Sequence, residues 1–287
     1  MTANATESKP AATAWLALLL VAMLALLPTA VRAEACVKTV RWELQPPYGV
    51  RLEDGSRGGY YADLVKEALR RMGCETRFVD LPWARGLREL QEGRLDIVAG
   101  VLVTPERAGY ARFSRPINLA PNVLFMRHHA MQGKRIVQLS DVIGTRLTIG
   151  VESSASYSAD YIRLQANPEF RKRLHFVPDR ARGWRMLATG RIDGLIADEA
   201  SAWAVGLPMQ PSDVQVSAVL QLSSIPAHVA LSRVTTDQAF VRRLNATLKG
   251  MVADGTLATF RERYIPCKTD PVTLGCQRGS GVLLPGP

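Results

Sequence analysis

The sequence is poor in the residues from which metal centres and common catalytic motifs are built. It has only four cysteines and four histidines among 287 residues. No two cysteines are spaced Cys-x-x-Cys, and the histidines (His128, His129, His175 and His228) show no ligand spacing. A Ser-His-Asp pattern, a paired-carboxylate motif and a phosphate-binding loop are missing as well. We therefore predict no metal, no cofactor and no catalytic residue.

Long apolar runs are missing after residue 27. Residues 14–27 form one uninterrupted apolar run, which is too short to span a bilayer comfortably but is typical of a signal-peptide core. Lys9 precedes it, and small residues at 31–33 or 33–35 suit a cleavage site. We predict a signal peptide over residues 1–35 and export of the mature chain. An uncleaved membrane anchor is the alternative.

The four cysteines indicate disulfides, because an even number in an exported protein meets an oxidising compartment. Three complete pairings are possible. We predict Cys36 with Cys74 and Cys267 with Cys276, since each pair lies near strand starts or chain ends, where a crosslink limits fraying. Buried free thiols are the alternative.

The charge is strongly positive but scattered. The formal net charge is +10, with 36 Lys and Arg against 26 Asp and Glu. A nucleic-acid-binding protein would gather such charge into a patch, whereas here it is spread through amphipathic segments. We predict a basic solvated surface with some attraction for anions and no nucleic-acid partner.

Strand-like and helix-like segments alternate twice along the chain. This alternation predicts parallel sheets covered by helices, and 287 residues suffice for two lobes. The expected strands lie at 39–44, 76–81, 95–103, 146–151, 173–178, 192–198 and 227–233, and the expected helices at 61–72, 84–93, 154–166 and 181–190. Residues 237–264 are expected to form a long helix, a turn at Asp254-Gly255 and a short helix.

A four-residue motif is repeated at equivalent places in the two halves of the chain. Gly-Arg-Leu-Asp at 93–96 and Gly-Arg-Ile-Asp at 190–193 both close a helix and begin an apolar strand. The repeat could reflect only a shared helix-to-strand loop. Because the surrounding order of elements repeats too, we predict two α/β lobes.

Five stretches carry a family resemblance: "GGYYADLVKEAL", "LPWARGLRELQEGRLDIVAG", "VTPERAGYARFSRPI", "GRIDGLIADE" and "MVADGTLATFRERY". Over residues 37–264 the chain resembles type II periplasmic substrate-binding proteins of the polar amino acid uptake class, the bacterial extracellular solute-binding family 3. The resemblance implies a two-lobed α/β clamshell, each lobe a mainly parallel sheet covered by helices. The expected boundaries are a signal peptide at 1–35, the first lobe at 36–124 and 225–266, the second lobe at 125–224 and a tail at 267–287.

The resemblance also implies a function. A monomer in the periplasm would capture a small carboxylate-bearing solute, an amino acid or a related compound, and deliver it to an ABC-transporter permease. The alternatives are a ligand-sensing module for a membrane signalling partner and, on the same fold, an enzyme resembling cyclohexadienyl dehydratase.

Arg107 and Asp198 are the main candidate ligand contacts. Arg107 follows a helix start, "TPER", beyond a strand end, where ligands of open α/β sheets bind, and in the resembled family this arginine holds the ligand's α-carboxylate. Asp198 ends a strand of the second lobe, where an aspartate of amino-acid binders accepts the ligand's ammonium. The competing interpretations are an ion pair of Arg107 with Glu106 or Asp96, and a helix cap for Asp198.

Further candidates lie at neighbouring strand ends. Serine hydroxyls and backbone N–H groups after the strand at 146–151 suit an anion, and aromatic rings could stack on the ligand. The full set of expected ligand contacts is Arg107, Asp198, Trp83, Tyr48, Ser154, Ser156, Gly100 and Arg85.

One departure of the sequence from the family pattern bears on the identity of the ligand. Leu102 stands where amino-acid binders often have a hydroxyl residue, and Ala99 and Gly100 supply no hydroxyl either. The resemblance therefore does not require a standard α-amino acid.

Overall fold

The computed structural model describes residues 36–119, 121–206, 208–209, 211, 214–223 and 225–265. These residues belong to one compact unit that begins at Cys36. The predicted signal peptide, the tail at 267–287 and the pair Cys267–Cys276 lie outside the described residues.

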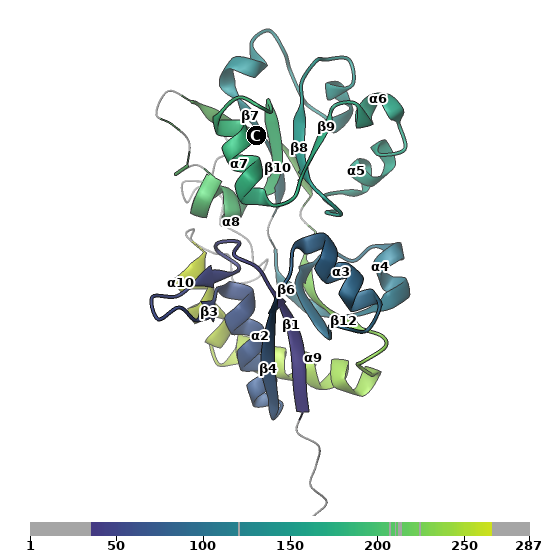
Figure 1. Cartoon of the computed structure of the whole chain (residues 1–287), viewed down its shortest axis with the longest axis vertical. Helices are drawn as coiled ribbons and strands as arrows, with labels where there is room; N and C mark the ends of the chain where they lie inside the picture. The colour runs from purple at the N-terminus through teal and green to yellow at the C-terminus, as the bar shows by residue number, and fades with distance from the viewer. Residues whose placement is uncertain are drawn as a thin grey trace, which may run out of the picture. The chain divides into compact units, whose positions relative to one another are not determined.

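A five-stranded sheet forms the first lobe, with strand order β4-β1-β5-β12-β6. Figure 1 shows β4 and β1 of this sheet side by side. Strand β1 pairs in parallel with both β4 and β5, whereas β12 is antiparallel to β5 and β6. The strands are β1 (Cys36–Trp42), β4 (Cys74–Asp80), β5 (Ile97–Val101), β6 (Ala111–Asn118) and β12 (Ala227–Ser232), and β2 (Val50–Arg51) and β3 (Arg57–Gly58) form a separate short hairpin.

A second five-stranded sheet forms the second lobe, in the order β11-β7-β10-β8-β9. Strand β8 is parallel to β9 and β10, and β7 is antiparallel to β10 and β11. The strands are β7 (Asn122–Arg127), β8 (Ile149–Glu152), β9 (Leu174–Val177), β10 (Gly194–Asp198) and β11 (Val216–Ser223).

The fold class is the predicted one, but the sheets are mixed rather than mainly parallel. Each contains two parallel and two antiparallel pairings. The helix-linked strands run parallel, as crossover connections require. The antiparallel pairings come from β6, β7, β11 and β12, by which the chain passes from the first sheet to the second and back.

Apolar helix faces cover the sheets. In α2, the buried residues Leu64, Val65, Ala68 and Leu69 recur at helical spacing, and they share a core with α9. The α-helices are α2 (Tyr60–Arg71), α3 (Trp83–Gln91), α4 (Pro105–Tyr110), α5 (Ala159–Leu164), α6 (Pro168–Arg171), α7 (Arg180–Ala188), α8 (Glu199–Ser201), α9 (Gln238–Ala253) and α10 (Thr256–Tyr264). In addition, η1 (His128–Met131) and η2 (Leu139–Val142) are 3₁₀ helices and η3 (Ala202–Gly206) is a π-helix.

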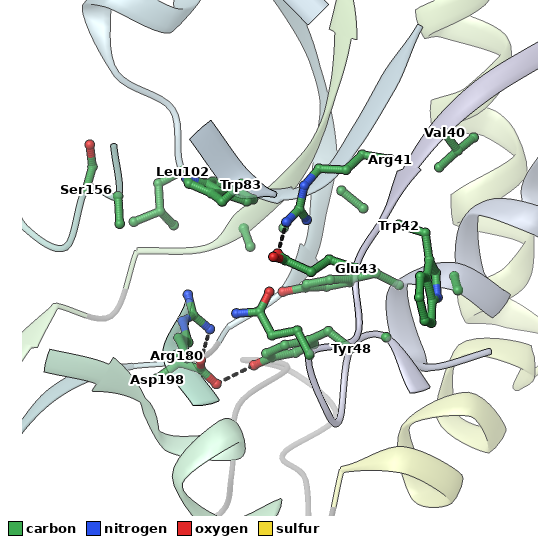
Figure 2. Close-up of a pocket in the computed structure, with 18 of the residues that line it drawn as sticks. Val40, Arg41, Trp42, Glu43, Tyr48, Trp83, Leu102, Ser156, Arg180 and Asp198 are labelled. Carbon is green, nitrogen blue, oxygen red and sulfur yellow. Dashed lines mark hydrogen bonds and ion pairs between the residues drawn. The ribbon is translucent and has the colours of Figure 1, made fainter. Parts of the chain in front are cut away.

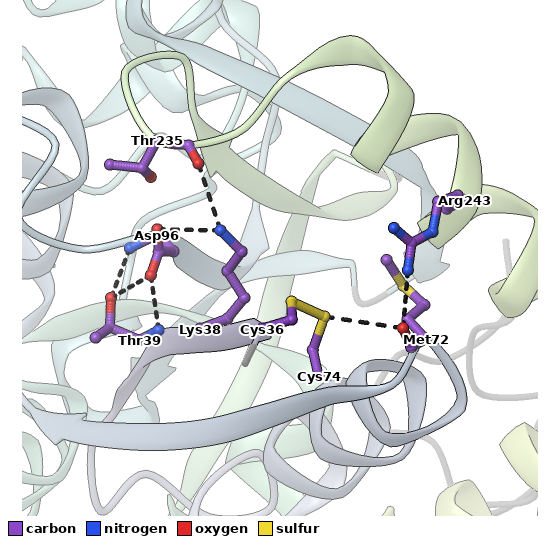
Figure 3. The surroundings of a disulfide bond; sticks show 8 residues. All are labelled: Cys36, Lys38, Thr39, Met72, Cys74, Asp96, Thr235 and Arg243. Carbon is purple, nitrogen blue, oxygen red and sulfur yellow. Dashed lines mark hydrogen bonds and ion pairs between the residues drawn. A yellow bond between two sulfur atoms is a disulfide. The ribbon is translucent and has the colours of Figure 1, made fainter. Parts of the chain in front are cut away.

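The predicted crosslink between Cys36 and Cys74 is confirmed (Figure 3). The two cysteines are the first residues of β1 and β4 and stand opposite each other in that parallel pair. The disulfide therefore fastens the edge of the first sheet where both strands begin. Within the described part of the chain, none of the helices is long and apolar enough to cross a membrane.

Candidate ligand-binding site

A pocket lies where strand ends of the two lobes face each other (Figure 2). Strands β1, β5 and β10 end beside it, and its lining includes Glu43, Gly100, Leu102 and Asp198. Side chains just past the carboxyl ends of parallel strands meet at one sheet edge, which is where α/β folds bind ligands.

Arg107 reaches this pocket from the first turn of α4. The hydroxyl of Thr104 caps that helix by accepting from the backbone N–H of Arg107 at 3.2 Å. The Arg107 side chain is buried, and it donates to two carbonyls, that of Leu102 at 2.9 Å and that of Ser154 at 3.0 Å. The second bond joins the two lobes. Burial lowers the pKa of this guanidinium.

No carboxylate within the described residues forms an ion pair with Arg107. Asp96, one partner considered from the sequence, is instead held by the backbone N–H and hydroxyl of Thr39, at 2.8 and 2.7 Å. Arg107 therefore has no carboxylate ion partner there; it donates to two carbonyls, with further electrostatic contributions from Tyr110 and Glu106.

Asp198 lines the pocket from the second lobe and is almost completely enclosed. One carboxylate oxygen accepts from the Tyr48 hydroxyl at 2.6 Å and from the backbone N–H of Ser201 at 2.9 Å. The other oxygen forms an ion pair with Arg180. Asp198 is thus the cap of α8 and a contact between the lobes at the same time.

Arg180, which the sequence analysis missed, sits at the centre of this network. It is the first residue of α7, and its Nε donates to Glu152 at 3.2 Å while its Nη1 pairs with Asp198. The side-chain oxygen of Gln45, in the first lobe, accepts from the same guanidinium at 3.1 and 3.2 Å. Burial would lower the pKa of Arg180, but the two carboxylates raise it above its usual value.

A second ion pair, between Arg41 and Glu43, lines the pocket on the side of the first lobe. Both residues lie at or just past the end of β1, and both are buried enough for desolvation to lower the pKa of Arg41 and raise that of Glu43. Figure 2 shows their side chains turned toward each other. The sequence offered a signal for Glu43 and Glu152, because each is a charged residue next to the last residue of an expected strand.

Aromatic rings form the remaining walls. Trp83, the first residue of α3, lies 5.1 Å from the guanidinium carbon of Arg41 and 6.0 Å from that of Arg107. Tyr48 stacks on Tyr61 with centroids 4.4 Å apart. Gly100 permits this arrangement, because it has φ +81° and a Cβ there would lie 2.5 Å from the Tyr61 ring.

The remaining sequence candidates are divided between two places. Ser156 lines the pocket, whereas Ser154 presents its carbonyl to Arg107 and Trp83 and lines a neighbouring groove. Arg85 lines that groove too, is 68% exposed and pairs with Glu89 at 3.7 Å. The structure therefore brings Arg107, Asp198, Trp83, Tyr48, Gly100 and Ser156 together at one pocket, without Ser154 and Arg85.

Comparison with known proteins identifies the family. Residues 39–266 match the bacterial extracellular solute-binding proteins, family 3. Because this match spans most of the chain, the protein belongs to that family, as its motifs predicted. The L-cystine-binding protein TcyJ of Escherichia coli (strain K12) is 21% identical over 220 residues, which cover 76% of this chain and 78% of that protein.

Solved structures confirm the type II periplasmic binding protein fold. An ancestral arginine-binding protein bound to arginine is 23% identical, with a TM-score of 0.67 and coverage of 79% of this chain and 97% of that one. A histidine kinase sensor domain with similarity to periplasmic binding proteins is 19% identical, with a TM-score of 0.68 and coverage of 82% and 97%. The same fold is therefore found in binding proteins and in a sensor.

Proposed function

We propose that this protein captures a small carboxylate-bearing solute, an amino acid or a related compound, between its two lobes in the periplasm and delivers it to an ABC-transporter permease. Membership of a solute-binding family supports capture. The L-cystine-binding relative and the arginine-bound structure support a ligand of amino-acid size. The disulfide between Cys36 and Cys74 supports an oxidising compartment.

The observation that carries the proposal is that the buried charge of Arg107 has no carboxylate partner among the described residues. A buried charge is costly unless it is paired, and no carboxylate of the described residues forms an ion pair with this guanidinium, which donates to two carbonyls and interacts with Tyr110. A ligand carboxylate in the pocket would supply the missing negative charge and could accept two parallel N–H bonds. The proposed contacts beside it are Tyr48, Trp83, Gly100, Ser156 and Asp198.

The lobes are proposed with the boundaries expected from the sequence, 36–124 with 225–266 and 125–224. The hydrogen bonds from Tyr48 to Asp198 and from Arg107 to Ser154 join them across the pocket. We propose that these contacts form as the lobes close on the ligand, and that the protein acts as a monomer.

The binding role is tested by calorimetry on Arg107 variants with a panel of amino acids and small carboxylic acids. We expect Arg107→Ala to weaken the best ligand by about thirtyfold or more, which corresponds to roughly 2 kcal/mol. Arg107→Lys should recover only part of the loss, because an ammonium cannot form the bidentate pair.

Arg85→Ala serves as the matched control, since Arg85 is exposed and outside the pocket. Wild-type affinity in folded Arg107→Ala would show that the arginine is only a structural charge. Conversion of a cyclohexadienyl acid by the wild-type protein would support the dehydratase alternative instead.

Delivery requires a separate test, because the fold alone serves transport and sensing. Stimulation of a permease–ATPase complex encoded beside the gene, by the loaded protein only, would support uptake. A neighbouring membrane kinase or cyclase that responds to the loaded protein would favour the sensing alternative.

A further inference from the structure

We propose that Arg180 is a built-in cation that takes the place of the ligand's ammonium at Asp198, so that the site selects carboxylates without an α-ammonium group. This inference rests on the proposed function and sharpens its ligand class. It differs from the expectation that Asp198 receives an amino group from outside.

The first support is that the carboxylate oxygens of Asp198 already have hydrogen-bond and ion-pair partners. Its carboxylate already accepts from the Tyr48 hydroxyl, the Ser201 backbone N–H and Arg180. An incoming ammonium would compete with a guanidinium that is itself fixed by Glu152. Displacing Arg180 from Asp198 would break one of the two ion pairs of a largely buried arginine, which is costly.

The second support is the charge of the pocket wall. The charged residues among the described lining are Arg41, Glu43, Arg107, Arg180 and Asp198. Three arginines against two carboxylates leave one positive charge, which belongs to Arg107. A ligand with a single carboxylate and no amine neutralises this surplus, whereas the ammonium of a zwitterion would meet no unpaired lining carboxylate.

Glu152 does not change this balance. Its carboxylate is buried and does not line the pocket. It forms an ion pair with Arg180 at 3.2 Å and not with Arg107, so the unpaired charge at Arg107 remains.

The third support is a shortage of acceptors. An ammonium needs oxygen acceptors for its N–H groups. Along the β5 end of the pocket, Ala99, Gly100 and Leu102 offer no side-chain oxygen, and the Leu102 carbonyl is already taken by Arg107. The β5 end of the pocket therefore presents apolar surface near the guanidinium of Arg107.

The test compares matched ligands that differ only in the α-ammonium group. The pairs are L-alanine with propionate, L-glutamate with glutarate, L-phenylalanine with 3-phenylpropionate and L-arginine with 5-guanidinopentanoate. By calorimetry we expect the wild-type protein to bind the deaminated member of its best pair about tenfold more tightly or better. Tighter binding of the amino acid would overturn the inference.

Arg180→Met tests the residue itself, since methionine retains length but not charge. We expect it to shift the ratio within the best pair by about tenfold toward the amino acid. Arg182→Met, on the same helix but exposed, should leave the ratio unchanged. An unchanged ratio in folded Arg180→Met would overturn the role of Arg180, and the wild-type comparison decides the ligand class even if that variant does not fold.

The two proposals fail in different ways. If the amino acid binds better and Arg107→Ala abolishes its binding, the proposed function stands and the role of Arg180 is wrong. If neither member of any pair binds, the proposed carboxylate function fails and the inference fails with it.

Discussion

At the scale of single residues, the pocket is organised by how each charge is balanced. Arg41 and Arg180 have carboxylate partners, whereas Arg107 has carbonyl partners. All three guanidinium groups are at least partly removed from water, so a missing counter-charge matters far more here than on the surface. This difference marks Arg107 as the side chain best placed to receive an anion.

Glu199 should make stability depend on pH. Burial, with a smaller contribution from Asp198, raises its pKa to about 7 from an ordinary value of 4.5. Between these values the unfolded chain releases a proton that the folded protein retains. The contribution of Glu199 to the free energy of unfolding is therefore fully present below pH 4.5 and declines as pH rises. Above pH 7 it is lost, and the total loss is roughly 3 kcal/mol at most.

Thermal unfolding from pH 4.5 to 8 measures this effect. Glu199→Gln should remove most of the decline, because the amide has the same shape and does not ionise. Parallel curves for the wild type and Glu199→Gln would contradict the assignment.

The sequence identified some pocket residues and not others for a physical reason. Arg107 and Asp198 lie in contiguous motifs that a reader can recognise. Arg180 becomes significant only because α7 starts at the end of β9 and turns its side chain toward Asp198, 18 residues away. Such a pairing depends on the three-dimensional placement of two elements, although a charged residue after an expected strand was a usable hint.

At the scale of elements, the short helix α4 fixes the position of Arg107. Thr104→Ala should cost about 1 kcal/mol of unfolding free energy, because the hydroxyl that caps α4 is lost. Ligand affinity should also fall, since the capped N–H belongs to Arg107 itself. Denaturant unfolding and calorimetry measure the two effects. Thr104→Ser, which retains the hydroxyl, should behave like the wild type, and equal losses in both variants would contradict the capping role.

The sequence predicted the helix-linked elements well and the connecting strands poorly. Helix α2 has strong amphipathic spacing and a glycine, Gly73, just past its end, and it was placed within one residue at each end. Strands β6, β7 and β11 were not predicted. The burial patterns of β6 and β11 do not alternate strictly, and all three are defined by pairing with strands distant in sequence, which local periodicity cannot reveal.

At the scale of the whole molecule, the disulfide should contribute substantially to stability. Cys36 and Cys74 are 38 residues apart, and a loop of that length predicts a stabilisation of about 4 kcal/mol from the restricted unfolded chain. The double variant Cys36→Ser/Cys74→Ser should therefore melt roughly 10 °C lower. Its secondary structure at 25 °C should remain that of the wild type by circular dichroism.

Calorimetric melting of that double variant measures the shift, and reductant should not lower its melting temperature as far as it lowers that of the wild type. An unchanged melting temperature would show that pairing of β1 with β4 needs no crosslink.

The placement of Trp83 has a consequence for spectroscopy. Its indole lies beside Arg41 and Arg107, and its Nε1 donates to the Ser154 carbonyl of the other lobe at 3.4 Å. Two nearby positive charges and a contact across the pocket make the indole's excited state sensitive to any anion that enters. Tryptophan emission can therefore report occupancy of the pocket in the native protein, without a dye or label, and Trp83→Phe identifies which part of the signal comes from this site.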